Sequence, residues 1–225
     1  MKPYFVKTPS LIPILYQNQI WSFSSIEKNI YLTFDDGPTP VITDWVLETL
    51  RKYDAHATFF CIGKNIEEHP TIFKRIINQG HAIGNHTYSH LNGWKTANKD
   101  YIENIHKAEK VMSDEYSVQT KTQNSELKIL NSKLFRPPYG KIKVSQMKSL
   151  QKLGYKTIMW SVLSADFDTT VDANKCLDNV IKNTENGSVI VFHDSVKAFD
   201  KLKVVLPKVL KHFKKKGLVF KSIKK

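Results

Sequence analysis

Two adjacent carboxylates at the end of an apolar run are the first residues of this sequence that point to chemistry. In the string YLTFDDGP, β-branched and aromatic residues lead directly into Asp35 and Asp36. Neighbouring aspartates at the end of a strand repel each other unless a cation or a proton separates their roles. Taken alone, the pair is explained slightly better by an Asx turn or a helix N-cap.

Two histidines four residues apart form the second candidate. The string GNHTYSH places His86 and His90 on one face of a helical turn, where both imidazoles can reach one metal ion. Two neutral imidazoles with one carboxylate and water form a site that keeps open positions. The spacing is weak by itself, because two surface histidines would look the same. Five further histidines lack such neighbours and are expected to be structural: His56, His69, His81, His106 and His212.

Two more strings carry polar groups beyond an expected strand. In FRPPYG, Pro137 and Pro138 restrict the backbone, and Gly140 allows it to turn again. Such a loop can hold an amide N–H toward an oxyanion while Arg136 pairs with a carboxylate, and a plain turn with a surface arginine is the competing interpretation. The apolar string SVIVF ends on His193, which suits acid or base chemistry, although a capping histidine has the same pattern.

Strands and helices that alternate along the chain must position these residues. Seven strands are expected, at residues 30–34, 58–62, 81–84, 133–136, 156–160, 188–192 and 218–221. Six helices are expected between them, at residues 43–53, 67–78, 100–113, 143–153, 171–183 and 200–215. This alternation predicts parallel βαβ units. An eight-unit barrel is typically about 250 residues, so the roughly 195 residues here predict a single-domain α/β fold, a distorted (β/α)7 barrel.

Each polar string falls at the carboxyl end of a different expected strand. Parallel barrels and open α/β sheets collect their catalytic side chains at these ends. The fifth string, MWSVLSADFD, has the same position and contributes Asp166 and Asp168. Taken together, the five strings favour a metal-assisted hydrolase site.

The five strings resemble the polysaccharide deacetylases, which are the family 4 carbohydrate esterases that carry the NodB homology domain. The resemblance covers residues 29–223 through TFDDGP, HTYSH, RPPYG, a degenerate fourth string and VFHD. It implies a distorted (β/α) barrel and a divalent metal, most often Zn²⁺, with Co²⁺, Ni²⁺ or Fe²⁺ as alternatives. The metal ligands that it implies are Asp36, His86 and His90.

The resemblance also implies roles for further residues. Asp35 would be the general base, and Arg136 would pair with it to keep it ionised and oriented. The backbone N–H of Tyr139 would stabilise the oxyanion, and His193 would protonate the departing amine. Three residues would line the substrate pocket: Pro137, Trp160 and Val191.

The fourth string departs from the family pattern. Where the family commonly shows DxxDW, this chain has Leu163 in place of the first aspartate and Phe167 in place of the tryptophan. The resemblance implies that a carboxylate of this region tunes the acid histidine. Asp166 or Asp168 is left for that role, and Asp166 is assigned to the catalytic set.

Composition restricts the class of protein. The chain has 225 residues, of which 41% are hydrophobic and 24% charged. These fractions exclude an intrinsically disordered protein. The chain has no apolar run of about eighteen residues, the length that a membrane span needs, which excludes a transmembrane protein. Basic side chains outnumber acidic ones by 34 to 21, and the resulting charge of +13 indicates an anionic partner. Both cysteines, Cys61 and Cys176, are expected to be buried apolar residues.

The expected domain division is an N-terminal extension, residues 1–28, followed by the catalytic domain, residues 29–225. Prolines interrupt every apolar stretch of the extension, so no signal peptide is predicted and the cytoplasm is the default location, with export by an unrecognised route as the alternative. The polar segment 116–128 is expected to be a surface insertion.

The leading hypothesis is a metal-dependent hydrolase that removes N-acetyl groups from an amino-sugar polymer, oligomer or glycolipid. A catalytically weak glycan-binding or membrane-surface protein on the same fold is the alternative from another class, and an amidase for a small amide or a formylated sugar lipid is a third. The expected partner is an N-acetylated glycan or glycolipid, with peripheral membrane contact as a further option. Nucleic acid is disfavoured, because the lysines do not interleave with aromatic residues.

Overall fold

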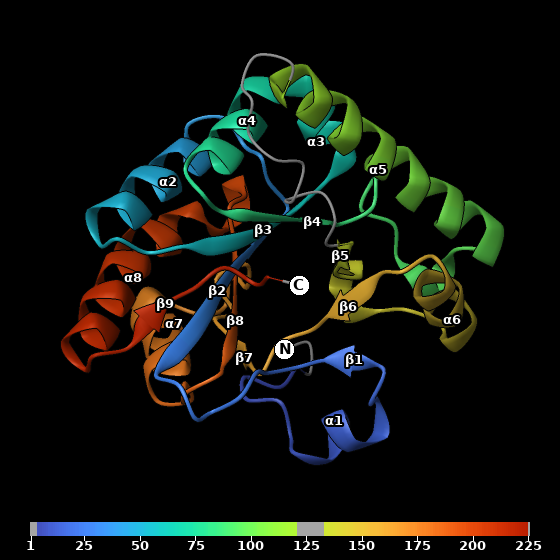
Figure 1. Ribbon diagram of the computed structural model, residues 1–225. Helices are drawn as coiled ribbons and strands as arrows, with labels where there is room; N and C mark the ends of the chain where they lie inside the picture. The colour runs from blue at the N-terminus through green and yellow to red at the C-terminus, as the bar shows by residue number, and fades with distance from the viewer. Residues whose placement is uncertain (1–3, 121–132, 225) are drawn as a thin grey trace.

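A curled parallel sheet forms the centre of the molecule (Figure 1). The computed structural model describes residues 4–120 and 133–224. Within these residues the sheet has nine strands in the order β1-β6-β5-β4-β3-β2-β8-β7, with β9 paired to β2. The strands are β1 (Gln19–Ile20), β2 (Asn29–Asp35), β3 (Ala57–Cys61), β4 (Ala82–Asn85), β5 (Leu134–Phe135), β6 (Lys156–Ile158), β7 (Val162–Leu163), β8 (Val189–His193) and β9 (Val219–Phe220).

Helices pack around the outside of the curled sheet, and Figure 1 shows them as an incomplete ring. They are α1 (Leu11–Leu15), α2 (Ile42–Lys52), α3 (Gly63–Glu68), α4 (Pro70–Asn78), α5 (Asn98–Thr120), α6 (Val144–Lys152), α7 (Ala173–Ile181) and α8 (Val196–Lys215), with short 3-10 turns at Gly93–Lys95 and Pro138–Gly140. The central strands are buried on both faces, as all five residues of β3 illustrate. The sequences of such strands are nearly continuous apolar runs, which is typical of parallel sheets.

The structure confirms the predicted fold class, a single α/β domain with a barrel-like parallel sheet. All seven predicted strands are present, and two were missed. The missed strands, β1 and β7, are two residues long, which is too short to give a periodic pattern. The helix expected at residues 67–78 is two helices that meet at His69, where Pro70 begins the second one.

The prediction of a surface insertion at residues 116–128 was wrong at its beginning. Helix α5 was expected to end at residue 113 and instead continues to Thr120, so the first residues of the polar segment are helical. Residues 121–128 lie outside the described residues. Helix α8 begins four residues earlier than expected, immediately after the string that ends in His193 and Asp194.

Parallel pairing brings the carboxyl ends of the central strands together. In the register of β2 and β8, Asp35 lies beside His193. In the registers of β3, β4 and β5, Asn85 lies beside both Cys61 and Phe135. His86 and Arg136 therefore follow neighbouring strands at the same edge, where the Arg136 N–H donates to the Asn85 carbonyl (3.1 Å).

The N-terminal residues cross the open side of the half-barrel. Residues 6–8 run antiparallel to β7, and Gln19 and Ile20 form β1, which pairs in parallel with β6 at the opposite edge of the sheet. Helix α1 lies between these two contacts (Figure 1). Among the described residues, none of the helices is both long and apolar enough to span a membrane.

Candidate active site

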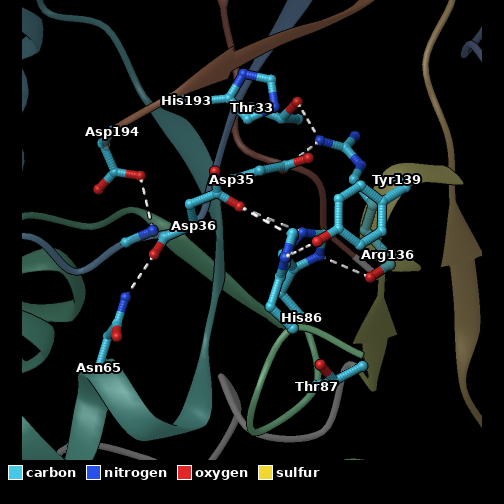
Figure 2. A network of polar contacts seen from close by, with 12 residues as sticks. Thr33, Asp35, Asp36, Asn65, His86, Thr87, Arg136, Tyr139, His193 and Asp194 are labelled. Atoms are coloured by element: carbon cyan, nitrogen blue, oxygen red, sulfur yellow. Dashed lines mark hydrogen bonds and ion pairs between the residues drawn. The ribbon is translucent and has the colours of Figure 1, made fainter. Parts of the chain in front are cut away.

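Asp36, His86 and His90 form a cluster of three metal-binding side chains. One ligand atom from each residue lies within 4.8 Å of the other two. The Asp36 Oδ1 atom is 3.7 Å from His86 Nε2 and 3.3 Å from His90 Nε2. Figure 2 shows the Asp36 carboxylate directed toward His86, from the loops that follow β2 and β4. One carboxylate and two imidazole nitrogens are a donor set that suits a divalent transition metal.

An unusual backbone conformation aims these side chains. Asp36 and His90 have positive φ angles, 82° and 56°, which non-glycine residues adopt only where their surroundings hold them. Two hydrogen bonds hold the turn after β2: Asn65 Nδ2 donates to the Asp36 carbonyl (2.7 Å), and the Gly37 N–H donates to Asp194 Oδ1 (3.1 Å). In this conformation the Asp36 carboxylate lies beside both imidazoles.

Hydrogen bonds at the far side of each ring orient the two histidines. His86 Nδ1 lies 2.7 Å from the Arg136 carbonyl, which can only accept, so Nδ1 carries the proton and Nε2 presents its lone pair toward Asp36. Burial lowers the pKa of His86 to about 4, which keeps the ring neutral. His90 Nδ1 lies 3.1 Å from the Tyr139 hydroxyl. A neutral His86 ring with its Nε2 lone pair free fits a metal ligand.

Asp36 carries the negative charge of the cluster. Burial raises the pKa of its carboxyl, but the hydrogen bond with His90 and the nearby imidazoles outweigh burial and hold the pKa well below its usual range. The group is therefore ionised at neutral pH. An anionic carboxylate is the form in which an aspartate binds a divalent cation.

Asp35, the residue before Asp36, pairs with a buried arginine. Arg136 Nη1 donates to Asp35 Oδ1 (2.7 Å), and the Arg136 side chain is fully buried. The other guanidinium N–H groups donate to Thr33 Oγ1 (2.6 Å), the Ile158 carbonyl (3.1 Å) and the Met159 carbonyl (2.8 Å). The guanidinium is thus held by four partners, and it holds the Asp35 carboxylate in one orientation.

His193 forms a second ion pair on the other side of Asp35. Its Nδ1 atom is 2.7 Å from Asp166 Oδ1, and its backbone N–H donates to Asp166 Oδ2 (2.8 Å). Burial lowers the pKa of His193, but the charge of Asp166 and its hydrogen bond outweigh burial and raise the pKa to about 9. Of the two candidate aspartates in the fourth string, Asp166 is therefore the one that pairs with His193. Asp168 lies elsewhere and accepts hydrogen bonds from Tyr4 and Thr170.

The predicted site residues surround one cavity of about 290 Å³. It is lined by Asp35, Asp36, His86, His90 and His193 together with Pro137, Tyr139, Trp160 and Val191. Tyr139 has a φ of 61°, so its turn is held in the left-handed region at the cavity wall. Arg136 and Asp166 lie behind this lining and contact it through Asp35 and His193. Two polar residues of the lining, Tyr4 and Lys197, were not among the predicted site residues.

Five lining residues were not predicted as site residues: Tyr4, Gly140, Leu163, Phe167 and Lys197. Leu163 and Phe167 belong to the fourth string, where they were noted only as departures. Lys197 lies in the first turn of α8 and belongs to none of the five strings. Tyr4 lies in the N-terminal segment, far from every motif, so no local pattern indicated it.

Comparisons with known proteins agree with this geometry. The family described as Polysaccharide deacetylase matches residues 24–158. A peptidoglycan-N-acetylglucosamine deacetylase of Bacillus cereus is 32% identical over 204 residues, which cover 90% of each chain. A chitooligosaccharide deacetylase of Azorhizobium caulinodans is 33% identical over 168 residues, which cover 75% of this chain and 74% of that protein.

A solved structure shares the whole fold. The crystal structure of a peptidoglycan N-acetylglucosamine deacetylase in complex with 4-naphthalen-1-yl-N-oxidanyl-benzamide superimposes with a TM-score of 0.83 at 32% identity, covering 96% of this chain and 95% of that one. The family match spans more than half of the chain, and the relatives align over nearly all of it. The chain therefore belongs to the polysaccharide deacetylase family, the family 4 carbohydrate esterases, which are hydrolases of linear amides.

Proposed function

We propose that this protein removes N-acetyl groups from an amino-sugar polymer, oligomer or glycolipid, with a divalent metal held by Asp36, His86 and His90. The observation that carries the proposal is the cavity where this cluster lies between the Asp35–Arg136 pair and the His193–Asp166 pair. Such a cavity holds a base, an acid and a metal-binding set within reach of one amide.

The donor set defines what a metal would contribute. A divalent ion bound there, Zn²⁺ being the proposed one, would polarise the acetamide carbonyl and make a water molecule more acidic. His86 and His90 would use their Nε2 atoms, because each Nδ1 atom already has a partner. Asp36 would supply the charged ligand.

Asp35 is the proposed general base. Its carboxylate lies at the cavity wall and is oriented by Arg136, which leaves the second carboxylate oxygen for the attacking water. The guanidinium is the buried partner that compensates the charge of the Asp35 carboxylate. Asp35 takes a proton from water as the water oxygen attacks the acetamide carbon.

His193 is the proposed general acid. Its raised pKa means that the ring is protonated at neutral pH, as a proton donor to the departing amine must be. Because Asp166 holds Nδ1, the Nε2–H group is the one available to the substrate. The proton moves to the amine nitrogen as its bond to the acetyl carbon breaks, and acetate and a free amino sugar result.

The turn at Tyr139 and three apolar side chains complete the proposed site. The Tyr139 backbone N–H would donate to the oxygen that becomes negative in the transition state. Trp160, Val191 and Pro137 line the same cavity and would enclose the acetyl methyl group. The relatives act on peptidoglycan or chitooligosaccharide, and we propose an N-acetylated glycan of this kind as the substrate here.

The binding-protein alternative has less support. The observations that favour it are the net charge of +13 and the altered fourth string. A glycan-binding protein has no need of an oriented base, an ion-paired acid histidine and a metal-ligand set in one cavity, and Asp166 fills the role that the altered string left open. We therefore propose an active enzyme.

The test measures acetate released from N-acetylglucosamine oligomers and from peptidoglycan fragments. Wild type is compared with Asp35→Asn and with Asp178→Asn, a control at an exposed carboxylate of α7. Loss of the base is expected to lower kcat by about 10²- to 10⁴-fold, whereas the control keeps the wild-type rate. Equal release by wild type and Asp35→Asn would refute the role of Asp35, and no release from any substrate by wild type would refute the function.

A further inference from the structure

Tyr4 lies in the catalytic cavity although it belongs to the N-terminal segment. It lines the same cavity as Asp35, His90 and His193. Exposure alternates along the segment: Tyr4 and Val6 are partly buried, whereas Phe5 is 62% exposed and Lys7 is also exposed. This alternation is typical of an extended strand with one face packed.

Main-chain hydrogen bonds fix the segment along β7. The Leu163 N–H donates to the Val6 carbonyl (2.8 Å), and the Thr8 N–H donates to the Ser161 carbonyl (2.9 Å). Thr8 Oγ1 also donates to the Trp160 carbonyl (2.7 Å). These bonds set the register of the segment against β7, so the Tyr4 ring is held at a defined place beside the loop that follows β7.

Tyr4 contacts two residues of that loop. Its hydroxyl donates to Asp168 Oδ2 (2.8 Å), and its ring lies 5.7 Å from the Phe167 ring between centroids. The Phe167 ring in turn lies edge-on to the His193 imidazole at 5.1 Å. Burial and then the contact with Asp168 raise the pKa of Tyr4 to about 12, so its hydroxyl is a donor at neutral pH.

The loop at residues 166–168 carries the partner of the acid histidine. Asp166 at its start holds His193 Nδ1, Phe167 covers the ring, and Asp168 ends the loop. A second side chain holds the same end, because Lys201 Nζ donates to the Asp168 carbonyl (2.7 Å). Tyr4 thus anchors the loop from the N-terminal side, while α8 anchors it through Lys201.

We propose that Tyr4 is a positioning residue for the general acid: it holds residues 166–168 so that Asp166 and Phe167 keep the His193 ring directed at the departing amine. This inference rests on the proposed function, in which His193 donates that proton. It makes the N-terminal segment a part of the active site. Tyr4 acts through Asp166 and Phe167 and transfers no proton itself.

The test compares two substrates that differ in their need for the acid. The amine of an N-acetylglucosamine oligomer must be protonated as it leaves, whereas the nitrophenolate of p-nitrophenyl acetate leaves as an anion. In Tyr4→Phe, which keeps the ring and loses the hydroxyl, kcat for the oligomer is expected to fall about fivefold, the effect of one lost hydrogen bond. Ester hydrolysis is expected to be unchanged. Phe5→Ala, an exposed neighbour, is the matched control and should change neither rate.

A second measurement needs only the glycan substrate. If Tyr4 acts through His193, then Tyr4→Phe lowers kcat in the wild-type background and has no further effect in the His193→Ala background. An equal loss on amide and ester with a lowered Tm, or an equal loss in both backgrounds, would indicate a merely structural role and overturn the proposal.

The outcomes also separate this inference from the proposed function. Full amide hydrolysis by His193→Ala would overturn the acid assignment and, with it, the role of Tyr4. A large loss in His193→Ala with no change in Tyr4→Phe would overturn the positioning role alone and leave the proposed function in place.

Discussion

At the scale of single residues, two adjacent aspartates have opposite surroundings. Asp35 faces the buried guanidinium of Arg136, whereas Asp36, turned away by its positive φ, faces two imidazoles. The guanidinium on one side and a metal cation on the other would separate two carboxylates that repel each other. The two aspartates of the DD pair therefore line one cavity in different roles: Asp35 pairs with the buried arginine, and Asp36 belongs to the metal-binding cluster.

The buried pair of Arg136 and Asp35 gives a stability prediction. Arg136→Met removes the guanidinium and leaves the Asp35 carboxylate buried without its counter-ion. The free energy of unfolding is expected to fall by about 3–5 kcal/mol, measured by urea denaturation. Adding Asp35→Leu should recover part of the loss, because the unpaired charge is then absent. A double variant less stable than Arg136→Met would contradict this account of the pair.

The His193–Asp166 pair gives a pH prediction. The pKa of His193 is raised to about 9 from an ordinary value of 6.5, so activity is expected to fall as pH rises through about 9 and the ring loses its proton. The pair also contributes to the free energy of unfolding. This contribution is fully present below the pKa that His193 has in the unfolded chain, and it is lost as pH rises through the raised pKa of the folded protein. Asp166→Asn should move the alkaline fall of kcat to lower pH, because a neutral amide stabilises the imidazolium less.

The control for the pH profile is Asp172→Asn, at the N-cap of α7. This change removes an exposed carboxylate that accepts from the Lys175 N–H and does not contribute to the raised pKa of His193, so it should leave the alkaline limb in place. If Asp166→Asn and wild type lost activity at the same pH, the alkaline limb would belong to another group.

At the scale of strands and helices, parallel pairing gathers residues that the sequence separates. Asp35, His86, Arg136 and His193 each end or follow a different strand. All four strands, β2, β4, β5 and β8, were predicted with boundaries within one residue. The carboxyl-end rule for parallel sheets then suffices to bring the motifs together. Both the metal-binding cluster and the buried arginine pair follow from local patterns.

Other features had no local pattern to indicate them. The strands β1 and β7 each form through pairing with a distant partner, and two residues carry no period. Tyr4 reaches the cavity through hydrogen bonds to residues about 160 positions away. The choice of Asp166 over Asp168 depends on the path of one loop, which the spacing of the two aspartates does not determine.

The close contact of β4 with β3 gives a prediction at this scale. A Cβ atom at Gly84 would lie 2.5 Å from the ring of Phe60, which in turn stacks on the Arg136 guanidinium. Gly84→Ala is expected to lower the free energy of unfolding by about 1–3 kcal/mol through this overlap. It should also weaken metal binding, because the strand that it displaces leads into His86. Urea denaturation and metal titration measure the two effects.

Gly154→Ala is the comparison for Gly84→Ala. Gly154 has a φ of 81° and no atom near its Cβ position, so only the backbone conformation opposes the change, at about 1 kcal/mol. Metal binding should remain at the wild-type level. Equal metal affinity in Gly84→Ala and wild type would mean that β4 does not set the position of His86.

At the scale of the whole molecule, the net charge of +13 is expected to affect how fast an anionic substrate associates with the protein. It is not expected to affect the reaction in the cavity. Salt screens such long-range attraction, since the Debye length is only about 10 Å at 0.1 M ionic strength. We expect kcat/KM for acidic peptidoglycan fragments to fall as sodium chloride is added, and kcat/KM for neutral chitooligosaccharides to stay nearly constant. Parallel salt profiles for the two substrates would show that the net charge has no part in substrate capture.

The central claim is that one cavity performs metal-dependent deacetylation through Asp36, His86 and His90. Its most direct test measures bound metal and acetate release together, for wild type, Asp36→Ala and chelator-treated wild type. We predict that wild type binds a divalent metal stoichiometrically and releases acetate, that Asp36→Ala loses both properties while keeping its fold by circular dichroism, and that added Zn²⁺ restores the chelator-treated enzyme. Undiminished acetate release by metal-free protein or by Asp36→Ala would contradict the account.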